Sequence, residues 1–304
     1  MDLTPFTSEH YYSVYNLFCD SNKRYTRTFE QFVENETKFT EKLDNRAFVV
    51  IIDNVCIAYI KTFNHYFYPD RKKALYFVAK DELAGKKLLP FIREVIENSQ
   101  MQGYKLGTSE FEDQYWKLEL LKDLGLAETS RMWRSCLDLE TYTLVDVNLD
   151  YEILNLAQLM KDDREENIKR INELEEVVWQ DVPMVDPRPP MKLDDFIELF
   201  EKTPYIEEAC FFIRVADQLV AQSTVGVNGD KIALVYMTGS RSEFRKKGLA
   251  TALKYLSMNK LKELGHEKLN TMNDLQNKPM LSINNKMGFI RDGAAKIMFD
   301  EKYC

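Results

Sequence analysis

The order of apolar and polar positions divides the first 140 residues into alternating helical and strand-like segments. Apolar residues three or four positions apart predict amphipathic helices, whereas short apolar runs rich in Val, Ile, Phe and Tyr predict strands. Two helices come first, strands follow, and helices and strands then alternate. The predicted helices are Glu9–Cys19, Phe29–Phe39, Lys87–Ser99 and Asp113–Leu124, and the predicted strands are Ala47–Ile52, Val55–Phe63, Ala74–Ala79, Tyr104–Ser109 and Trp133–Leu139.

The same order of elements returns after residue 140. Predicted there are a strand at Thr143–Val147, helices within Tyr151–Trp179 and at Leu193–Phe200, strands at Ala209–Val215, Leu219–Val227, Ile232–Thr238 and Lys268–Asn273, and a helix that begins at Asn277 and ends at Gly288. This recurrence indicates an internal repeat of one fold. We therefore predict an α/β (α+β) chain of two tandem domains, residues 1–140 and 143–304. Each domain should have a mixed, mostly antiparallel central sheet flanked by helices.

A strand–loop–helix segment, Ile232 to Ala250, forms the centre of the second repeat. An apolar run ends in a short polar loop, and a glycine precedes a helical pattern. The first N–H groups of a helix lack intrahelical partners and form the positive end of its dipole, so such a turn can hold an anion. Gly248 lets the backbone approach a ligand without a Cβ, and Ala250 keeps the following turn small. The segment predicts a phosphate-binding loop.

Two motifs in this half resemble the GNAT superfamily of N-acetyltransferases. The spacing Arg245-x-x-Gly248-x-Ala250 is similar to its Arg/Gln-x-x-Gly-x-Gly/Ala signature, and Asn277 followed by Gly288-Phe289 is similar to its last motif. The resemblance implies two GNAT-like domains and acetyl-CoA as cosubstrate. It also implies a set of donor-binding residues, which are Thr238, Gly239, Ser240, Arg245, Lys246, Lys247, Gly248, Leu249, Ala250, Thr251, Asn277 and Asn284.

The first repeat lacks both motifs. When Gly85 is set against Ala250, Pro90 falls inside the corresponding helix, where it removes a backbone hydrogen bond. In this alignment Lys80 and Leu83 stand where the second repeat has Arg245 and Gly248. Counting back from Gly125, as from Gly288, places Gln114 and Leu121 where the second repeat has Asn277 and Asn284. We expect residues 1–140 to be a degenerate GNAT-like domain that binds no CoA, and residues 143–304 to be the catalytic domain.

The segment 178–191 is rich in prolines, which exclude a helix and predict an ordered loop. In the superfamily this region borders the acceptor pocket. The resemblance therefore makes Trp179, Asp181 and Asp186 candidate contacts to the acceptor. The acceptor itself is expected to be an amine on a small molecule or a peptide.

Charge is divided unevenly along the chain, whose net charge is -8. From Lys231 to Cys304 there are 14 Lys and Arg against 7 Asp and Glu, a net charge of +7, which leaves -15 for the preceding residues. A basic segment that contains the phosphate loop suits a ligand with several phosphates. An acidic remainder attracts cationic amines and disfavours nucleic acid as a partner.

Composition also argues against metal and membrane classes. The five cysteines and three histidines have no metal-type spacing, and an odd number of cysteines does not indicate a disulfide framework. No apolar run approaches transmembrane length, and the N-terminal stretch lacks the pattern of a secretory signal. We expect a cytoplasmic protein with no metal and no membrane partner.

These observations predict an acetyl-CoA-dependent N-acetyltransferase, in which the acceptor amine attacks the donor directly in a ternary complex. Two alternatives remain open. One is a non-catalytic acyl-CoA-binding regulatory module, and the other is a transferase of a larger acyl group.

The predicted mechanism departs from the superfamily at one position. The general acid there is often a Tyr seven residues after the Asn of the last motif, and this chain has Asn284. A carboxamide donates a hydrogen bond but supplies no proton at a useful pH. We therefore expect Asn284 to orient or stabilise the departing thiolate. The alternative acids are Tyr236, Tyr255 and Tyr303, and the candidate bases are Asp181 and Glu243.

Overall fold

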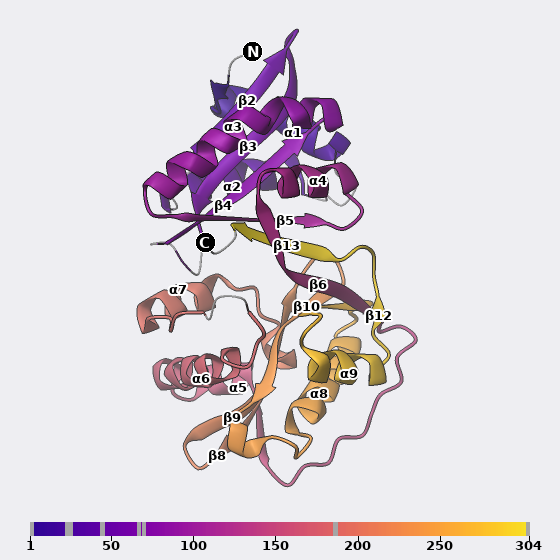
Figure 1. Cartoon of the computed structure of the whole chain (residues 1–304). Coiled ribbons are helices and arrows are strands. Elements are labelled where there is room, and N and C mark those ends of the chain that lie inside the picture. Colours follow the sequence, from indigo (N-terminus) through magenta and orange to yellow (C-terminus); the bar gives the residue numbers. More distant parts are fainter. Residues whose placement is uncertain are drawn as a thin grey trace. The chain divides into compact units, whose positions relative to one another are not determined.

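The computed structural model describes residues 3–21, 27–42, 46–65, 68, 71–184 and 188–301 (Figure 1). The chain divides into two compact units, one made of Met1–Arg131 with Lys296–Cys304 and the other of Met132–Ala295. Each unit contains a mixed, mostly antiparallel sheet with helices packed against it. The predicted fold class is therefore confirmed.

The first unit begins with two helices and continues with strands and helices in alternation. Its described helices are α1 (Tyr11–Ser21), α2 (Phe29–Lys42), α3 (Glu82–Met101) and α4 (Tyr115–Asp123). Its strands are β1 (Thr4–Pro5), β2 (Arg46–Ile52), β3 (Val55–Asn64), β4 (Lys72–Ala79), β5 (Lys105–Phe111), the first half of β6 (Leu126–Asp138) and β13 (Lys296–Glu301). Pro90 lies inside α3, as the sequence pattern indicated.

The first sheet has the order β1-β2-β3-β4-β5-β13, and only β4 and β5 pair in parallel. Neighbouring residues on its strands point to opposite faces of the sheet. Helices pack against both faces, so each face has a buried core. Tyr59, for example, packs with residues of α1 and α2, whereas Ile60 packs with residues of α3 and α4. The last strand of the chain contributes to the second of these cores through Ile297 and Phe299.

The second unit repeats this arrangement. Its described helices are α5 (Leu156–Lys161), α6 (Arg164–Trp179), α7 (Leu193–Lys202), α8 (Leu249–Glu263) and α9 (Lys278–Lys286). Its strands are the second half of β6, β7 (Glu152–Asn155), β8 (Phe211–Val215), β9 (Gln218–Val227), β10 (Ile232–Ser240), β11 (Lys268–Asp274) and β12 (Ile290–Arg291). The sheet order is β7-β8-β9-β10-β11-β6, with β12 also paired to β6, and β10 and β11 form its parallel pair.

The boundary between the units differs from the predicted one. It lies inside β6, between Arg131 and Met132, and not at residues 141–142, and residues 296–304 belong to the first unit. The reason is strand pairing over long sequence distances. The second half of β6 pairs with β11, and β13 pairs with β5, so the terminal strands are assigned by their ladders rather than by sequence order.

The predicted strand Thr143–Val147 is wrong. These residues form no ladder, and the first strand after residue 140 is β7, which lies inside a segment predicted to be helical. The side chain of Asn259 on α8 explains the difference. Its Oδ1 accepts the Val145 N–H at 3.1 Å and its Nδ2 donates to the Val145 carbonyl at 2.7 Å. One side chain thus satisfies the backbone groups that a neighbouring strand would have used.

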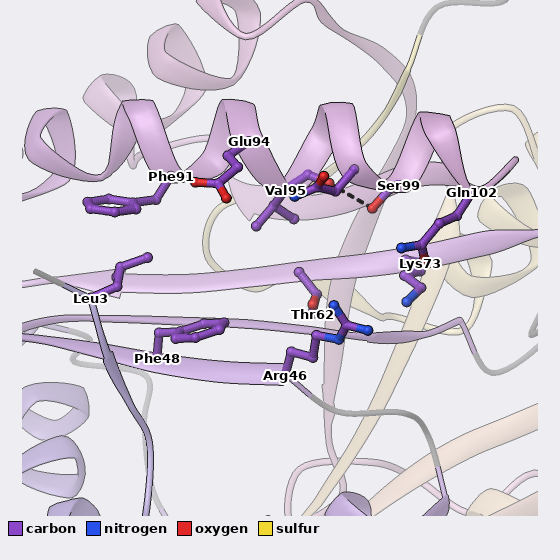
Figure 2. A pocket seen from close by; sticks show the side chains of 11 residues that line it. Leu3, Arg46, Phe48, Thr62, Lys73, Phe91, Glu94, Val95, Ser99 and Gln102 are labelled. Atoms are coloured by element: carbon purple, nitrogen blue, oxygen red, sulfur yellow. Dashed lines mark hydrogen bonds between the residues drawn. The ribbon is translucent and has the colours of Figure 1, made fainter.

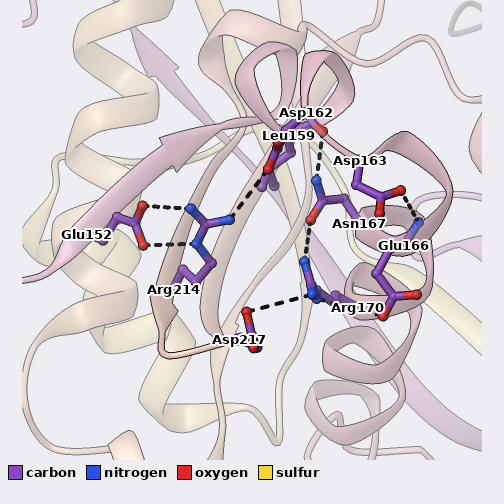
Figure 3. A network of polar contacts seen from close by, with 9 residues as sticks. All are labelled: Glu152, Leu159, Asp162, Asp163, Glu166, Asn167, Arg170, Arg214 and Asp217. Atoms are coloured by element: carbon purple, nitrogen blue, oxygen red, sulfur yellow. Dashed lines mark hydrogen bonds and ion pairs between the residues drawn. The ribbon is translucent and has the colours of Figure 1, made fainter.

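Ion pairs occupy the acidic surface around the start of α6 (Figure 3). Arg214 on β8 binds Glu152 through two hydrogen bonds of 2.7 and 2.9 Å, and it lies 3.9 Å from Asp162. Arg170 donates to the Asn167 side chain at 3.2 Å and lies 3.8 Å from Asp217. Within α6, Lys169 and Arg170 lie 3.4 and 3.9 Å from Glu166, as opposite charges three and four positions apart on a helix do.

Candidate functional site

The parallel strands β10 and β11 separate after three residue pairs. The ladder joins Ile232–Leu234 to Lys268–Asn270, yet β10 continues to Ser240 and β11 to Asp274. On its other side β10 stays paired with β9 as far as Ser240, with an irregularity between Val235 and Met237. We call the gap after Leu234 the β10–β11 opening. An extended chain can bind along such a strand edge through main-chain hydrogen bonds.

The predicted residues Thr238, Gly239 and Ser240 form the end of β10 at this opening. Thr238 is buried, and its Oγ1 lies 3.5 Å from the Ser223 hydroxyl, which also accepts a hydrogen bond from Ser257 of α8 at 3.1 Å. Gly239 lies against α6, because a Cβ at this position would fall 2.4 Å from Cγ1 of Val178. A glycine is therefore needed for the close approach of α6 to the strand.

The loop after β10 leads into α8, and its backbone conformation leaves the N–H groups at the helix start free to bind an anion. Lys246 and Gly248 have left-handed φ angles of 61° and 76°, and no side chain caps the helix. A Cβ on Gly248 would meet no atom within 4 Å, so the space in front of the helix is open. The N–H groups of Leu249, Ala250 and Thr251 belong to the first turn, where no intrahelical acceptor exists. The positive helix end and these donors make an anion-binding cradle.

Basic side chains surround this cradle. Lys246 and Lys247 are exposed, and the Lys247 ammonium lies 4.9 Å from the Phe244 ring centroid. Arg245 forms an ion pair with Asp181, which follows α6, and its Nε lies 3.5 Å from the Ser240 carbonyl. The donor set of backbone N–H groups, lysines and an arginine fits a phosphate-bearing ligand.

The two asparagines of the last motif have different positions. Asn277 caps α9, since its Oδ1 accepts the Met280 N–H at 3.2 Å, as its place in the sequence predicts. Asn284 is 3% exposed, its Nδ2 donates to Asn273 Oδ1 at 2.7 Å, and its Oδ1 accepts from the Lys254 ammonium. Its expected contact with a thiolate stays a prediction. Sequence reasoning did not single out Lys254, because a lysine on a helix is most often a surface residue.

The acceptor-side candidates have partners of their own. The Trp179 indole donates to Glu175 at 3.1 Å, and its ring lies 5.0 Å from the Arg188 guanidinium. Asp181 is the ion-pair partner of Arg245. Asp186 lies outside the described residues. The structure therefore brings Asp181 to the cradle and leaves the role of Trp179 in acceptor binding as a prediction.

Glu175 is a carboxyl group that sequence reasoning left without a function, because it lies in an acidic run of α6. Burial raises its pKa, although hydrogen bonds from Trp179 and Gln222 act in the opposite direction. Gln222 of β9, which donates to Glu175 at 3.4 Å, is the ladder partner of Gly239. A carboxyl group with a raised pKa thus lies next to the strand that borders the opening.

The other candidate acids and bases are less well placed. Hydrogen bonds from its own backbone N–H and from Ser242 lower the pKa of Glu243, which is exposed. Tyr236 packs against Gly226 and Tyr205, and burial raises its pKa. Tyr255 packs against the main core of the second unit. Tyr303 lies outside the described residues.

Replacing Glu175 with Gln is expected to make the protein more stable at neutral pH. Since the pKa of Glu175 is raised in the folded state, the unfolded state loses its proton first, and wild-type stability falls as pH rises above the ordinary value of 4.5. The variant avoids this loss, so its advantage should vanish below that pH. Urea unfolding at acidic and neutral pH would measure it, with Glu173→Gln, an exposed change on the same helix, as the control. If Glu175→Gln were more stable than wild type by the same amount at both pH values, the raised pKa of Glu175 would be contradicted.

The corresponding helix start in the first unit already carries an anion. Asp81 caps α3, and its carboxylate accepts the Ala84 N–H at 2.8 Å. Gly85 lies under the Trp116 ring, because a Cβ there would fall 2.1 Å from a ring carbon. A second anion at this helix start would meet the Asp81 carboxylate. The start of α3 thus differs from the uncapped start of α8, and the expectation that the first repeat binds no CoA stays a prediction.

A cavity of about 480 Å³ lies beneath α3 in the first unit (Figure 2). Leu3, Phe48 and Phe91 line one part of it, and Arg46, Thr62 and Gln102 line another. It contains none of the residues predicted to bind a donor or an acceptor.

Within the described ranges no three His, Cys, Asp or Glu side chains are grouped in a way that could hold a metal ion. None of the helices in those ranges combines the length and apolar composition of a membrane-spanning segment.

Solved structures share the fold of the whole chain. A GCN5-related N-acetyltransferase from Sphaerobacter thermophilus is 12% identical and matches with a TM-score of 0.75 over 98% of this chain and 94% of its own. A tandem GNAT protein from the clavulanic acid biosynthesis pathway is 14% identical, with a TM-score of 0.69 over 98% and 97% of the two chains. A glucosamine N-acetyltransferase region of a fungal multi-domain β-N-acetylglucosaminidase is 11% identical, with a TM-score of 0.74 over 98% of this chain and 38% of that one.

Neither a family model nor a curated protein matches the sequence. At these low identities the structural likeness shows the fold. The chain has the tandem GNAT fold, which confirms the fold that the two sequence motifs implied.

Proposed function

We propose that the chain is an acetyl-CoA-dependent N-acetyltransferase with one donor site, in its second unit. The observation that carries this proposal is the uncapped start of α8, where a left-handed Gly248 faces open space beside three basic residues. The CoA pyrophosphate would bind there, and bound acetyl-CoA supplies an activated thioester. Gly248, Leu249, Ala250 and Thr251 would donate N–H groups to the phosphates, and Arg245, Lys246 and Lys247 would neutralise them.

The β10–β11 opening supports the same assignment. It begins after Leu234 and leaves the backbone of Thr238–Ser240 unpaired on the side of β11. The arm between the pyrophosphate and the thioester of acetyl-CoA contains amide groups, which can pair with a strand edge as another strand would. The cradle at the end of β10 and the edge of β10 together suit the two parts of the donor.

The acceptor is proposed to be an amine, and Glu175 is the residue best placed to receive its proton. Asp181 is occupied by Arg245, and Glu243 is exposed with a lowered pKa. Burial raises the pKa of Glu175, which makes its carboxylate a stronger base near neutral pH. We also propose that the donor carries an acetyl group and that the acceptor amine attacks it directly. The resemblance of the two sequence motifs to the GNAT superfamily supports these two points.

The principal alternative is a non-catalytic acyl-CoA-binding regulatory module. One observation favours it: the position often occupied by a catalytic tyrosine holds Asn284, whose amide is hydrogen-bonded inside the unit. Both functions require the cradle, so only the acceptor side separates them. A transferase of a larger acyl group is distinguished by comparing acetyl-CoA with longer acyl-CoA donors.

The experiment is release of free CoA thiol from acetyl-CoA across a panel of amines, with binding measured separately by calorimetry. The panel includes an amino sugar, because one structure of the same fold is a glucosamine N-acetyltransferase region, together with amino acids, polyamines and peptides. Release stimulated by an acceptor supports the enzyme. Tight binding without stimulated release by any class supports the regulatory module, and the absence of binding refutes both.

One acetyl-CoA is expected to bind per chain. The second unit offers an uncapped helix start with glycine, whereas the first unit has Asp81 on the helix start and Pro90 within the helix. Titration calorimetry gives the stoichiometry directly. Two equivalent sites would contradict the expectation, and an Asp81→Ala variant that gained a second site would identify the cap as its cause.

A further inference from the structure

Lys254 is a buried cation near the middle of α8. Only 1% of its surface is exposed, although lysines are almost never fully buried without a partner of opposite charge. Its ammonium donates to Asn284 Oδ1 and lies 4.7 Å from the Phe289 ring centroid. Within the described ranges no carboxylate contacts it. Burial of an ammonium without a carboxylate costs stability, so its presence points to a function.

Lys254 belongs to a polar cluster next to the β10–β11 opening. Asn284 donates to Asn273 Oδ1 at 2.7 Å, and the Thr271 hydroxyl lies 3.3 Å from the same oxygen. Thr271 and Asn273 follow Asn270, the last residue of β11 that pairs with β10. The four residues Lys254, Thr271, Asn273 and Asn284 are called the α8–β11 cluster. The cluster places polar side chains, rather than apolar ones, beside the point where β10 and β11 separate.

The cluster lies within reach of the thioester end of a bound donor. Lys254 is six residues after Gly248, which is about 9 Å along the helix. The free edge of β10 from Val235 to Ser240 is about 16 Å long. A ligand with its pyrophosphate at the start of α8 and its arm along β10 therefore brings its sulfur into the region that the cluster borders.

We propose that Lys254 stabilises the departing CoA thiolate and protonates it, an inference that rests on the proposed acetyltransferase function. The acceptor nitrogen forms a bond to the acetyl carbon, the carbon–sulfur bond breaks, and its electron pair passes to the sulfur. The ammonium of Lys254 gives one proton to that sulfur, and the acceptor nitrogen gives one proton to the proposed base, Glu175. Glu175 then releases this proton to solvent while Lys254 takes one up from solvent, so the protons balance. Asn284 positions the ammonium by accepting its hydrogen bond.

The electrostatics of the cluster suit this role. Burial lowers the pKa of Lys254 from 10.5 to about 7, close to the value at which a group donates a proton efficiently at neutral pH. No charged group contributes to this shift. The other charged residues on α8, α9, β11 and β12 are the exposed Glu263, Lys268, Lys278, Lys286 and Arg291, the half-buried Lys260 and Lys262, and the buried Asp274, which accepts the Gln276 N–H at 2.7 Å.

The test measures the acidity of the thiol of free CoA bound to the protein, which needs no acceptor. The ultraviolet absorbance of the thiolate is followed against pH, with desulfo-CoA as the blank. We expect the wild-type protein to lower the thiol pKa by about one unit or more, because a thiolate beside Lys254 forms an ion pair that also keeps the lysine protonated, and the two groups titrate as a coupled pair. Lys254→Met should return the thiol pKa to that of free CoA. Lys260→Met, a change at a half-exposed lysine of the same helix that pairs with Glu208, should keep the lowered value.

The outcomes are separable. If wild-type protein binds CoA but leaves the thiol pKa unchanged, or if Lys254→Met keeps it lowered, the role of Lys254 is refuted while the donor site stands. If CoA does not bind, the proposed function is refuted and this inference with it. A purely structural lysine would leave the thiol pKa unchanged in all three proteins.

Discussion

Replacing Gly248 with Glu is expected to abolish acetyl-CoA binding while the protein stays folded. The new carboxylate would stand where the N–H groups of the first turn of α8 face a phosphate. Two unit charges about 4 Å apart near a protein surface repel by on the order of 4 kcal/mol, which is roughly a 1000-fold loss of affinity. The fold should tolerate the change, because a Cβ at this position meets no atom within 4 Å. The cost in stability is that of a left-handed φ for a non-glycine residue, roughly 1 kcal/mol.

Titration calorimetry with acetyl-CoA measures this loss, and circular dichroism reports on the fold. Gly265→Glu is the matched control, since Gly265 ends α8 with a φ of 81° and also has nothing within 4 Å of its Cβ position. It carries the same strain and the same charge at the opposite end of the same helix, and it should bind acetyl-CoA normally. Gly248→Lys keeps the strain and removes the repulsion, so it should retain most of the affinity. A folded Gly248→Glu protein with wild-type affinity would show that the start of α8 is not the donor site.

Replacing Lys254 with Met is expected to stabilise the protein at acidic pH and to lose that advantage at alkaline pH. The folded state lowers the pKa of Lys254 from 10.5 to about 7, so below pH 7 the wild-type protein pays the full cost of burying the charge. This difference in pKa between the unfolded and folded states corresponds to about 4–5 kcal/mol in the free energy of unfolding. Loss of the hydrogen bond to Asn284 offsets about 1–3 kcal/mol of this gain. The net gain is therefore about 1–4 kcal/mol.

The sign of the pH dependence distinguishes this account from simple repacking. Between the folded and the ordinary pKa the unfolded wild-type chain holds a proton that the folded protein lacks, so wild-type stability rises with pH. Urea unfolding of both proteins at about pH 6 and about pH 10 measures the difference. It should be largest at the lower pH and disappear or reverse at the higher one. Lys260→Met should show neither effect, and equal stability of Lys254→Met and wild type at both pH values would mean that Lys254 carries no desolvation cost.

Local features of the sequence were sufficient for most of the fold. Helical and strand periodicities depend on which face of an element is buried, and they recur in the same order in both halves, so they indicated two units of one fold. The loop before α8 was also readable, because Gly248 is required by its left-handed backbone and the N–H groups of a helix start follow from geometry alone. The N-cap role of Asn277 is equally local, since it involves a residue three positions away.

Tertiary structure decided the features that depend on contacts between distant residues. Val145 is held by Asn259 instead of by a strand, β13 completes the first sheet, and Asp181 reaches Arg245. Lys254 and Asn284 are thirty positions apart and meet only because α8 and α9 pack together. A periodic pattern shows that a residue lies on a helix, but the burial of its side chain depends on what packs above it. The sequence alone therefore determined that one fold occurs twice and that the loop before α8 suits an anion. The burial of Lys254 beside the β10–β11 opening was decided by the packing of α8 against α9, which are distant in the sequence.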